Sequence, residues 1–325
     1  MQTYFSLDEN FEEIIEKELK EKFDVKAINS MEQISTGWTN IVYKVKTDNG
    51  NYYFRFPRDD FWEKTIVKDY QFAKFIYGKT SFNTVDLKLG YSNNRPFSIH
   101  KEIEGVALAE KMNDLTQKDI EKIANQLAKF MHELHNIQYD ENEIFTVNNI
   151  GLELQDFITE LLEKHVSKED NEFWYKNDFK TKPNDQCLVH GDFNSSNVLL
   201  DSENNVVAII DFGFGGFGSK SQDISRIIGR CPDSFKTPII NAYEKIAKQE
   251  LEKNQLNQDI ETWNNIDNAY INYMSKIGIY KRYRKKMVIF NHLLHYLYQF
   301  HQCHHLNQYL QILFVPLLLI LKHHL

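Results

Sequence analysis

The hydrophobic and polar positions divide the chain into two parts of different character. In the first hundred residues, β-branched and aromatic side chains form short runs separated by turn residues, a pattern typical of strands. Asp48-Asn49-Gly50-Asn51 predicts a hairpin turn between two of these runs, because Asn and Gly tolerate the positive φ angles of such turns. The elements expected in this part are helix 11–23, strands 27–34, 41–47 and 52–56, helix 61–77, and strands 85–91 and 97–103.

After Gly105 the pattern becomes that of helices. Apolar residues from Ile120 to His135 recur at intervals of three and four residues, and Thr116 with Asp119 is a candidate N-terminal cap. Further helices are expected at 152–165, 239–253, 263–278 and 285–300, with one β-rich segment at 187–212 between them. The sequence therefore predicts an α+β protein with two lobes, a small β-rich N-lobe over residues 1–103 and a larger helical C-lobe over residues 104–325.

Composition and charge narrow the class of protein. The 325 residues are 42% hydrophobic and 26% charged, with a net charge of −8, so we expect a globular chain that does not bind nucleic acid. An acidic surface suits a cationic substrate. The longest apolar run, residues 312–321, contains Pro316 and is shorter than the roughly 20 residues that span a bilayer. With no secretion signal and three scattered cysteines, we expect packed thiols and a cytoplasmic protein without membrane contact, as a monomer or weak dimer.

The segment CLVHGDFNSSNVLLDSENNVVAIIDFG, residues 187–213, carries the candidate chemistry. Its apolar runs alternate with polar loops, and a hairpin that turns at residues 204–205 would bring Asp192, Asn197 and Asp211 to neighbouring strand ends. Two carboxylates and an amide offer oxygen ligands, which match Mg²⁺ better than zinc. Phosphoryl transfer needs such a site, since the nucleotide's charge must be held while an acceptor hydroxyl is aligned. The alternative interpretation is that these residues only form turns.

HGDFNSSN followed by IIDFG resembles the aminoglycoside phosphotransferase family, protein-kinase-like enzymes that phosphorylate small molecules. The resemblance implies a protein-kinase-like bilobal fold, Mg²⁺ as cofactor and ATP or GTP as phosphoryl donor. By this match Asp192 would orient the substrate hydroxyl and accept its proton, and Asn197 and Asp211 would coordinate magnesium. His190 would support the loop.

The first part of the chain offers positions that match the nucleotide-binding half of the family. Arg55 lies where the family has a phosphate-binding lysine or arginine. An acid on the following helix should pair with this cation, and periodicity favours Asp69 over Glu63. Guanidinium can also grip phosphate with two hydrogen bonds. The alternative is that Arg55 is an exposed strand cation in a surface ion pair.

Two further segments resemble nucleotide-binding parts of the family. QISTGWTNIVYKV, residues 33–45, contains Gly37 where a loop that covers the nucleotide belongs. RPFSIHKEIEG, residues 95–105, resembles the hinge between the lobes, and we expect backbone groups from Lys101 to Ile103 to bond the purine. The choice between ATP and GTP is open.

The sequence departs from the family after the IDFG motif. The family commonly continues with Gly-Asp-Pro and then Asp, whereas Ser219-Lys220 stand here in the place of Asp-Pro. Asp223 keeps its position, and we expect it to bond backbone groups of the catalytic loop. The segment from Phe212 to Gly229 is expected to be a flexible loop that is less acidic than a site for a polycationic antibiotic.

The resulting expectation is Mg-dependent transfer of a phosphoryl group to a hydroxyl of a small molecule, with an aminoglycoside or related antibiotic as first choice. A metabolic kinase acting on choline, homoserine or a sugar is the alternative, and a nucleotide-binding pseudoenzyme is a third. Candidate substrate contacts on the later helices are Glu153, Asp156, Glu160, Trp263, Asp267 and Tyr270. A zinc site is the alternative for His292, His295, His301, His304 and His305, but their spacing favours packing and surface roles.

Overall fold

The computed structural model describes residues 10–34, 39–139, 153–176 and 186–277. The chain forms two compact units, and the boundary between them falls after Tyr270. Almost all described residues belong to the first unit. The border of two lobes at residues 103 and 104 lies inside this unit and stays a prediction.

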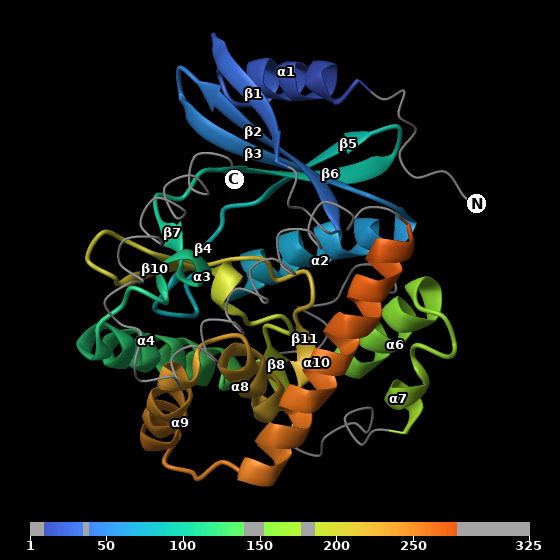
Figure 1. The fold of residues 1–325 in the computed structure, drawn as a ribbon. Helices are drawn as coiled ribbons and strands as arrows, with labels where there is room; N and C mark the ends of the chain where they lie inside the picture. Colours follow the sequence, from blue (N-terminus) through green and yellow to red (C-terminus); the bar gives the residue numbers. More distant parts are fainter. Residues whose placement is uncertain (1–9, 35–38, 140–152, 177–185, 278–325) are drawn as a thin grey trace, which may run out of the picture. The chain divides into compact units, whose positions relative to one another are not determined.

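An antiparallel sheet of five strands forms the N-terminal region (Figure 1). Its strand order is β1-β2-β3-β6-β5. The strands are β1 (Ile28–Ile34), β2 (Asn40–Thr47), β3 (Gly50–Pro57), β5 (Lys88–Ser92) and β6 (Arg95–Lys101). Helix α1 (Phe11–Lys22) covers this sheet, and its Ile15 and Leu19 are fully buried in a cluster with aromatic residues of β3 and β6. The expected helix and strands of this region are confirmed.

The predicted hairpin turn between β2 and β3 is present. Thr47 pairs with Gly50, so Asp48 and Asn49 form the turn. Gly50 has a φ of +107°, a conformation that residues with a Cβ atom rarely adopt. The hydroxyl of Thr47 donates to the Gly50 carbonyl at 2.7 Å, which closes the turn.

Helix α2 (Asp60–Ile76) connects the sheet to the rest of the first unit. The side chain of Asp59 accepts hydrogen bonds from the amides of Phe61 and Trp62 and so caps the helix. The buried face of α2 includes Asp69, which is only 1% exposed although it is charged. A carboxylate buried to this degree requires a partner.

The C-terminal region is helical around the second hydrophobic core. Its helices are α3 (Leu108–Lys111), α4 (Gln117–His135), α6 (Leu154–His165), α7 (Glu172–Tyr175), α8 (Lys220–Gly229), α9 (Asp233–Ala247) and α10 (Lys253–Lys276). The capping box of Thr116 and Asp119 that begins α4 is confirmed, and α4 packs along α9. Buried Cys187 and Cys231 are free thiols, as expected, and burial raises the pKa of Cys231 to about 12.

Short strands carry the loops of the β-rich segment. β9 (Val198–Leu200) and β10 (Val206–Ile209) form the predicted hairpin, with Asn204 in its turn at a φ of +61°. β4 (Asn83–Thr84) and β7 (Val106–Ala107) extend this hairpin to a four-stranded sheet. β8 (Cys187–Val189) instead pairs with β11 (Gly216–Gly218). This second pairing brings the segment after IDFG beside the strand that leads into HGD.

Several expectations need correction. Residues 212–229 are not a flexible loop, because they contain β11 and α8, whose start is fixed by the Gln222 side chain accepting from the Ser219 amide. α9 begins at Asp233 and ends at Ala247, earlier than expected at both ends. It includes Pro238 in its second turn, where proline cannot donate the usual backbone hydrogen bond. α10 begins at Lys253, ten residues before the predicted start.

Two expectations concern the end of the chain. The helix predicted at 285–300 and the apolar run at 312–321 both lie outside the described residues. Among the helices that the structure describes, none is long and apolar enough to cross a membrane.

Candidate active site

A cavity of about 520 Å³ lies in the first unit, bordered by β3, α2, the HGD and IDFG loops, α8 and α10. Four of the predicted site residues line it, namely Arg55, Asp192, Asn197 and Asp211. The structure therefore brings the two sequence motifs and the predicted phosphate-binding cation to one place.

The HGD loop has a backbone conformation that only glycine accommodates well. Gly191 has a φ of +77°, and a Cβ atom there would lie 2.3 Å from the carbonyl oxygen of Phe214. The loop is thus packed directly against the segment after IDFG. His190 is buried, with its Nε2 3.0 Å from the Ile210 carbonyl oxygen, and its Nδ1 accepts from the Asp192 amide at 3.3 Å. Its predicted supporting role is confirmed.

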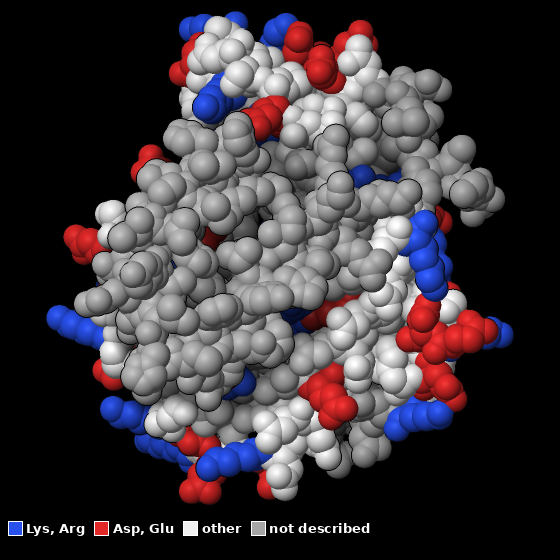
Figure 2. All heavy atoms as spheres, in the orientation of Figure 1, with Lys and Arg blue, Asp and Glu red and all other residues white. Residues whose placement is uncertain are grey.

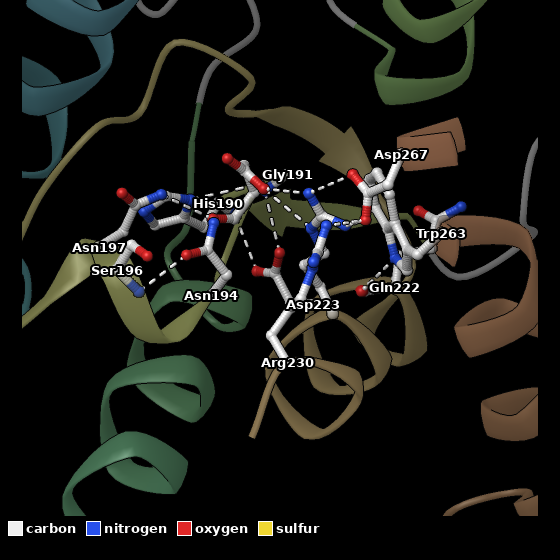
Figure 3. Close-up of polar contacts among 12 residues, drawn as sticks. His190, Gly191, Asn194, Ser196, Asn197, Gln222, Asp223, Arg230, Trp263 and Asp267 are labelled. Carbon is white, nitrogen blue, oxygen red and sulfur yellow. Dashed lines mark hydrogen bonds and ion pairs between the residues drawn. The ribbon is translucent and has the colours of Figure 1, made fainter. Parts of the chain in front are cut away.

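Asp223 of α8 holds the same loop from the other side (Figure 3). Its carboxylate accepts hydrogen bonds from the amides of His190 at 2.7 Å and Gly191 at 2.9 Å. His135 of α4 is in turn 3.3 Å from Asp223, and Tyr243 of α9 is 2.8 Å from His135. The expected hydrogen bonds between Asp223 and backbone groups of the HGD loop are confirmed.

Asn197 ends a short 3₁₀ turn, η2 (Ser195–Asn197), which follows the HGD loop. The Asn194 side chain caps this turn by accepting from the Ser196 amide at 2.8 Å. The side-chain nitrogen of Asn197 donates to the Asp192 carbonyl at 2.9 Å. This bond orients the amide group and leaves its oxygen as the atom that could bind a cation.

Asp211 is held in a strained conformation at the end of the hairpin. Its φ of +67° is uncommon for a residue other than glycine. The Asp211 side chain is 41% exposed, and its Oδ1 accepts from Arg55 Nη2 at 3.0 Å. One carboxylate from Asp211 and one amide oxygen from Asn197 suit Mg²⁺, which usually takes few protein ligands and completes its shell with phosphate oxygens and water.

The predicted pair of Arg55 and Asp69 is present. Arg55 Nη1 donates to Asp69 Oδ2 at 2.6 Å, and Asp69 Oδ1 accepts from the Phe212 amide at 2.8 Å. Burial alone would lower the pKa of Arg55, but the two nearby carboxylates outweigh it and raise the pKa, so the guanidinium is cationic. Glu63, the other acid considered, pairs with Arg95 instead.

Arg226 is a site residue that the sequence did not reveal. It lies on α8, lines the cavity and contacts Asp192, while Asp267 and Trp263 of α10 hold it from the opposite side of its guanidinium group. The available signal was the spacing of Asp223 and Arg226, because residues three apart share a helix face. The contacts of Arg226 with Asp192 and Asp267 join residues that are 34 and 41 positions apart, so no local sequence pattern indicated them.

The other residues predicted to bind the nucleotide, Lys101, Ile103 and Gly37, are not among the described residues that line this cavity. Lys101 and Ile103 line a different hollow of about 600 Å³, together with His100 and Tyr52. Gly37 lies outside the described residues. The backbone contacts to the purine therefore stay a prediction.

The candidate substrate contacts separate into two groups. Trp263, Asp267 and Tyr270 line the cavity, as do Trp62 and Phe214. Glu153, Asp156 and Glu160 are not among the described residues that line it, and Glu160 forms an ion pair with Lys64 of α2. Polar and charged residues make up most of the described lining, and the four aromatic residues are a minority of it.

The five C-terminal histidines considered for zinc lie outside the described residues. Within the described ranges, no three His, Cys, Asp or Glu side chains are arranged to hold a metal ion. The smaller set of Asn197 and Asp211 fits the oxygen chemistry of magnesium.

Solved structures of phosphotransferases share this fold. The complex of APH(2″)-IIIa with GDP and kanamycin has 18% sequence identity and a TM-score of 0.62, and the match covers 82% of this chain and 92% of that one. The gentamicin complex of APH(2″)-IIa has 22% identity and a TM-score of 0.55, with 89% and 95% covered. The macrolide 2′-phosphotransferase MphH from Brachybacterium faecium has 13% identity and a TM-score of 0.55, with 78% and 88% covered. The expected protein-kinase-like fold is confirmed.

A family model gives the assignment by sequence. The APH model, described as the phosphotransferase enzyme family, matches residues 30–253, which is more than half of the chain. This range includes both sequence motifs and the Arg55–Asp69 pair. The chain therefore belongs to the phosphotransferase enzyme family.

Proposed function

We propose that this phosphotransferase moves the terminal phosphoryl group of Mg-ATP or Mg-GTP to a hydroxyl group of a small molecule. The observation that carries the proposal is the presence of Asp192, Asn197, Asp211 and Arg55 around one cavity. Related structures were solved with GDP, ATP or ADP, which supports a purine nucleotide as the donor.

Each residue has a role that its position supports. Asn197 and Asp211 would hold the metal ion, which supplies positive charge to the nucleotide phosphates when bound. Arg55 would contact a phosphate oxygen through Nη2, the group that donates to Asp211 in this structure. Asp192 would accept a hydrogen bond from the acceptor hydroxyl and align its oxygen with the terminal phosphorus.

The bonds that change are those of a direct transfer. The acceptor oxygen forms a bond to the terminal phosphorus, and the bond from that phosphorus to the bridging oxygen breaks. The nucleoside diphosphate leaves with the electron pair of the broken bond. The proton of the acceptor hydroxyl passes to the carboxylate of Asp192.

The acceptor we favour is an aminoglycoside or a related antibiotic. Neighbouring structures hold kanamycin and gentamicin, and one is a macrolide phosphotransferase. Phe214, which is the partly exposed one of the four aromatic residues that line the cavity, could pack against the apolar face of a sugar or macrolide ring.

A second acceptor class is supported by the charges of the cavity. Arg226 and Arg230 line it beside Asp267, so the acid is already neutralised by two cations. On the described part of the face in Figure 2, acidic and basic side chains are interspersed. A less cationic acceptor, such as a sugar or homoserine, fits these charges better than a polyamine does.

The test is a transfer assay with a panel of acceptors. The purified protein is incubated with ATP or GTP, MgCl₂, and kanamycin, gentamicin, a macrolide, choline, homoserine or a sugar, and release of nucleoside diphosphate and the mass of the product are measured. Asp192→Asn should lower kcat by at least about 100-fold and leave nucleotide binding intact. Asp201→Asn, a carboxylate of the same segment that is not among the described cavity residues, is the matched control.

Two results would contradict the proposal. Full activity of Asp192→Asn would remove Asp192 from its role. Tight nucleotide binding without transfer to any acceptor or to water would favour a nucleotide-binding pseudoenzyme.

A further inference from the structure

The carboxylate of Asp192 is held by Arg226 through one of its two oxygens. Arg226 Nε donates to Asp192 Oδ1 at 2.8 Å, and Arg226 Nη2 lies 2.7 Å from the same oxygen. Both donors therefore meet on Oδ1. The Asp192 side chain is 23% exposed and lines the cavity, so Oδ2 is the oxygen left for an acceptor hydroxyl.

Arg226 is itself held by two residues of α10, Asp267 and Trp263. Its Nη1 donates to Asp267 Oδ2 at 2.6 Å, and its Nη2 donates to Asp267 Oδ1 at 3.1 Å. The guanidinium carbon lies 4.6 Å from the centre of the Trp263 ring, and Trp263 donates from Nε1 to the Gln222 carbonyl at 3.0 Å. Trp263 and Asp267 both belong to α10 and lie near each other in Figure 3.

These contacts determine both the position and the plane of the guanidinium group. A bidentate carboxylate fixes a planar cation in direction, and an aromatic ring beneath it fixes its tilt. The Arg226 side chain is only 9% exposed. Burial would lower the pKa of Arg226, but Asp192 and Asp267 outweigh it and raise the pKa, so the positive charge is permanent.

A buried ion pair is weak evidence for a purely stabilising role, because desolvation of the charges offsets much of their attraction. This network also ends on Asp192, the carboxylate proposed to align the acceptor hydroxyl. In phosphoryl transfer, alignment of the acceptor contributes more than the strength of a base, since the transition state is loose. A rigid cation that fixes one oxygen of this carboxylate would supply that alignment.

We propose that Arg226, held by Asp267 and Trp263, is a positioning residue that fixes Oδ1 of Asp192 and directs Oδ2 toward the acceptor hydroxyl. The proposal rests on the proposed role of Asp192. Arg226 does not contact the reacting atoms; it acts through Asp192. α10 thereby contributes to the geometry of the HGD loop although it is distant in the sequence.

The test compares Arg226→Ala, Arg226→Lys and Asp192→Asn in the transfer assay, with the best acceptor of the panel and with water as acceptor. A misplaced reacting group costs on the order of 100-fold, so Arg226→Ala should lower kcat by roughly 10- to 100-fold, with nucleotide KM nearly unchanged. Arg226→Lys keeps the charge without the planar pair of donors and should be intermediate. Methylguanidine added to the buffer should restore part of the activity of Arg226→Ala and leave the wild-type protein unaffected.

The outcomes separate the two proposals. Wild-type kcat in folded Arg226→Ala, together with an inactive Asp192→Asn, overturns the positioning role and leaves the proposed function standing. An active Asp192→Asn overturns the proposed function itself. Should Arg226→Ala not fold, Arg226→Lys decides: an unchanged kcat, or a loss that follows the fraction of unfolded protein, contradicts the positioning role, whereas a loss of kcat in fully folded protein at constant nucleotide KM supports it.

Discussion

Two arginines line the same cavity, and each bridges a pair of carboxylates. Arg55 of β3 joins Asp69 of α2 to Asp211 of the IDFG motif. Arg226 of α8 joins Asp267 of α10 to Asp192 of the HGD motif. In each bridge one carboxylate belongs to a sequence motif and the other is supplied by a helix.

The bridges differ in how deeply the helix carboxylate is buried. The Asp69 side chain is 2% exposed and also accepts the Phe212 amide, whereas the Asp267 side chain is 13% exposed and also pairs with Arg230. Only the Asp69 end of the first bridge is therefore part of the core, since the Asp211 side chain is 41% exposed, whereas both carboxylates of the second bridge are partly exposed, at 23% and 13%. We expect loss of the first to affect folding and nucleotide binding, and loss of the second to affect chiefly the rate of transfer.

Replacement of Arg55 should have the largest effect. Arg55→Ala leaves the Asp69 carboxylate buried without its cation, so the free energy of unfolding should fall by about 3–5 kcal/mol. A lost charged hydrogen bond to phosphate should raise the nucleotide KM by at least about tenfold. Urea unfolding and initial rates measure the two effects.

A paired substitution separates stability from binding at this bridge. The double variant Arg55→Met with Asp69→Leu should recover much of the lost stability, because two apolar groups can replace a buried ion pair, and it should not recover nucleotide binding. Equal stability of Arg55→Ala and the wild-type protein would show that the Asp69 end of this bridge is not part of the core.

Replacement of Asp267 should have an intermediate effect. Asp267→Ala removes one of the two carboxylates of Arg226 and leaves the other, so we expect a loss of about 1–3 kcal/mol in unfolding free energy. The kcat should fall with nucleotide KM unchanged. Arg230→Ala serves as the comparison, since its half-exposed ion pair should contribute less than about 1 kcal/mol to stability. A rise in nucleotide KM for Asp267→Ala would show that the two bridges do not act separately.

Lys68 is another cation of α2, only 2% exposed, and its replacement should change stability in the opposite direction. Its ammonium lies 4.7 Å from the centre of the Phe157 ring, and burial lowers its pKa to about 7. The unfolded chain keeps this proton up to a pH of about 10.4, so the unfolded state binds more protons between the two values. The destabilising contribution is thus complete below pH 7 and disappears as pH rises toward 10.

Lys68→Met should therefore raise the unfolding free energy at pH 7, and this gain should decline as the pH rises toward 10. Unfolding curves at several pH values measure it. Lys74→Met, an exposed lysine of the same helix, is the control and should show no such pH dependence. A gain that is constant with pH would mean that Lys68 does not lose its proton on folding.

Most of the fold could be predicted from the sequence where the pattern is local. α1, α2 and α4 follow from their apolar spacing, and the hairpin of β2 and β3 follows from its turn residues. β11 and α8 were missed because residues 212–221 are rich in Gly and Ser, which resemble a loop. The pairing of β11 with β8 involves three residues of each strand, and only tertiary packing selects it.

The candidate site divides in the same way. Asp192, Asn197 and Asp211 lie within one segment, so one motif reveals them. The Arg55–Asp69 pair could be expected from the family resemblance, and the structure contains it. The bridge through Arg226 joins residues that are 34 and 41 positions apart. These residues meet only through tertiary packing, which a local sequence pattern does not reveal.

The distance between the HGD and IDFG loops depends on an atom that Gly191 does not have. A methyl group at this position would lie 2.3 Å from the Phe214 carbonyl oxygen, well inside contact distance. The two loops would have to separate, and with them the carboxylates of Asp192 and Asp211. The spacing of the two carboxylates that we propose to orient the acceptor and to bind the metal ion therefore depends on the absence of a side chain at Gly191.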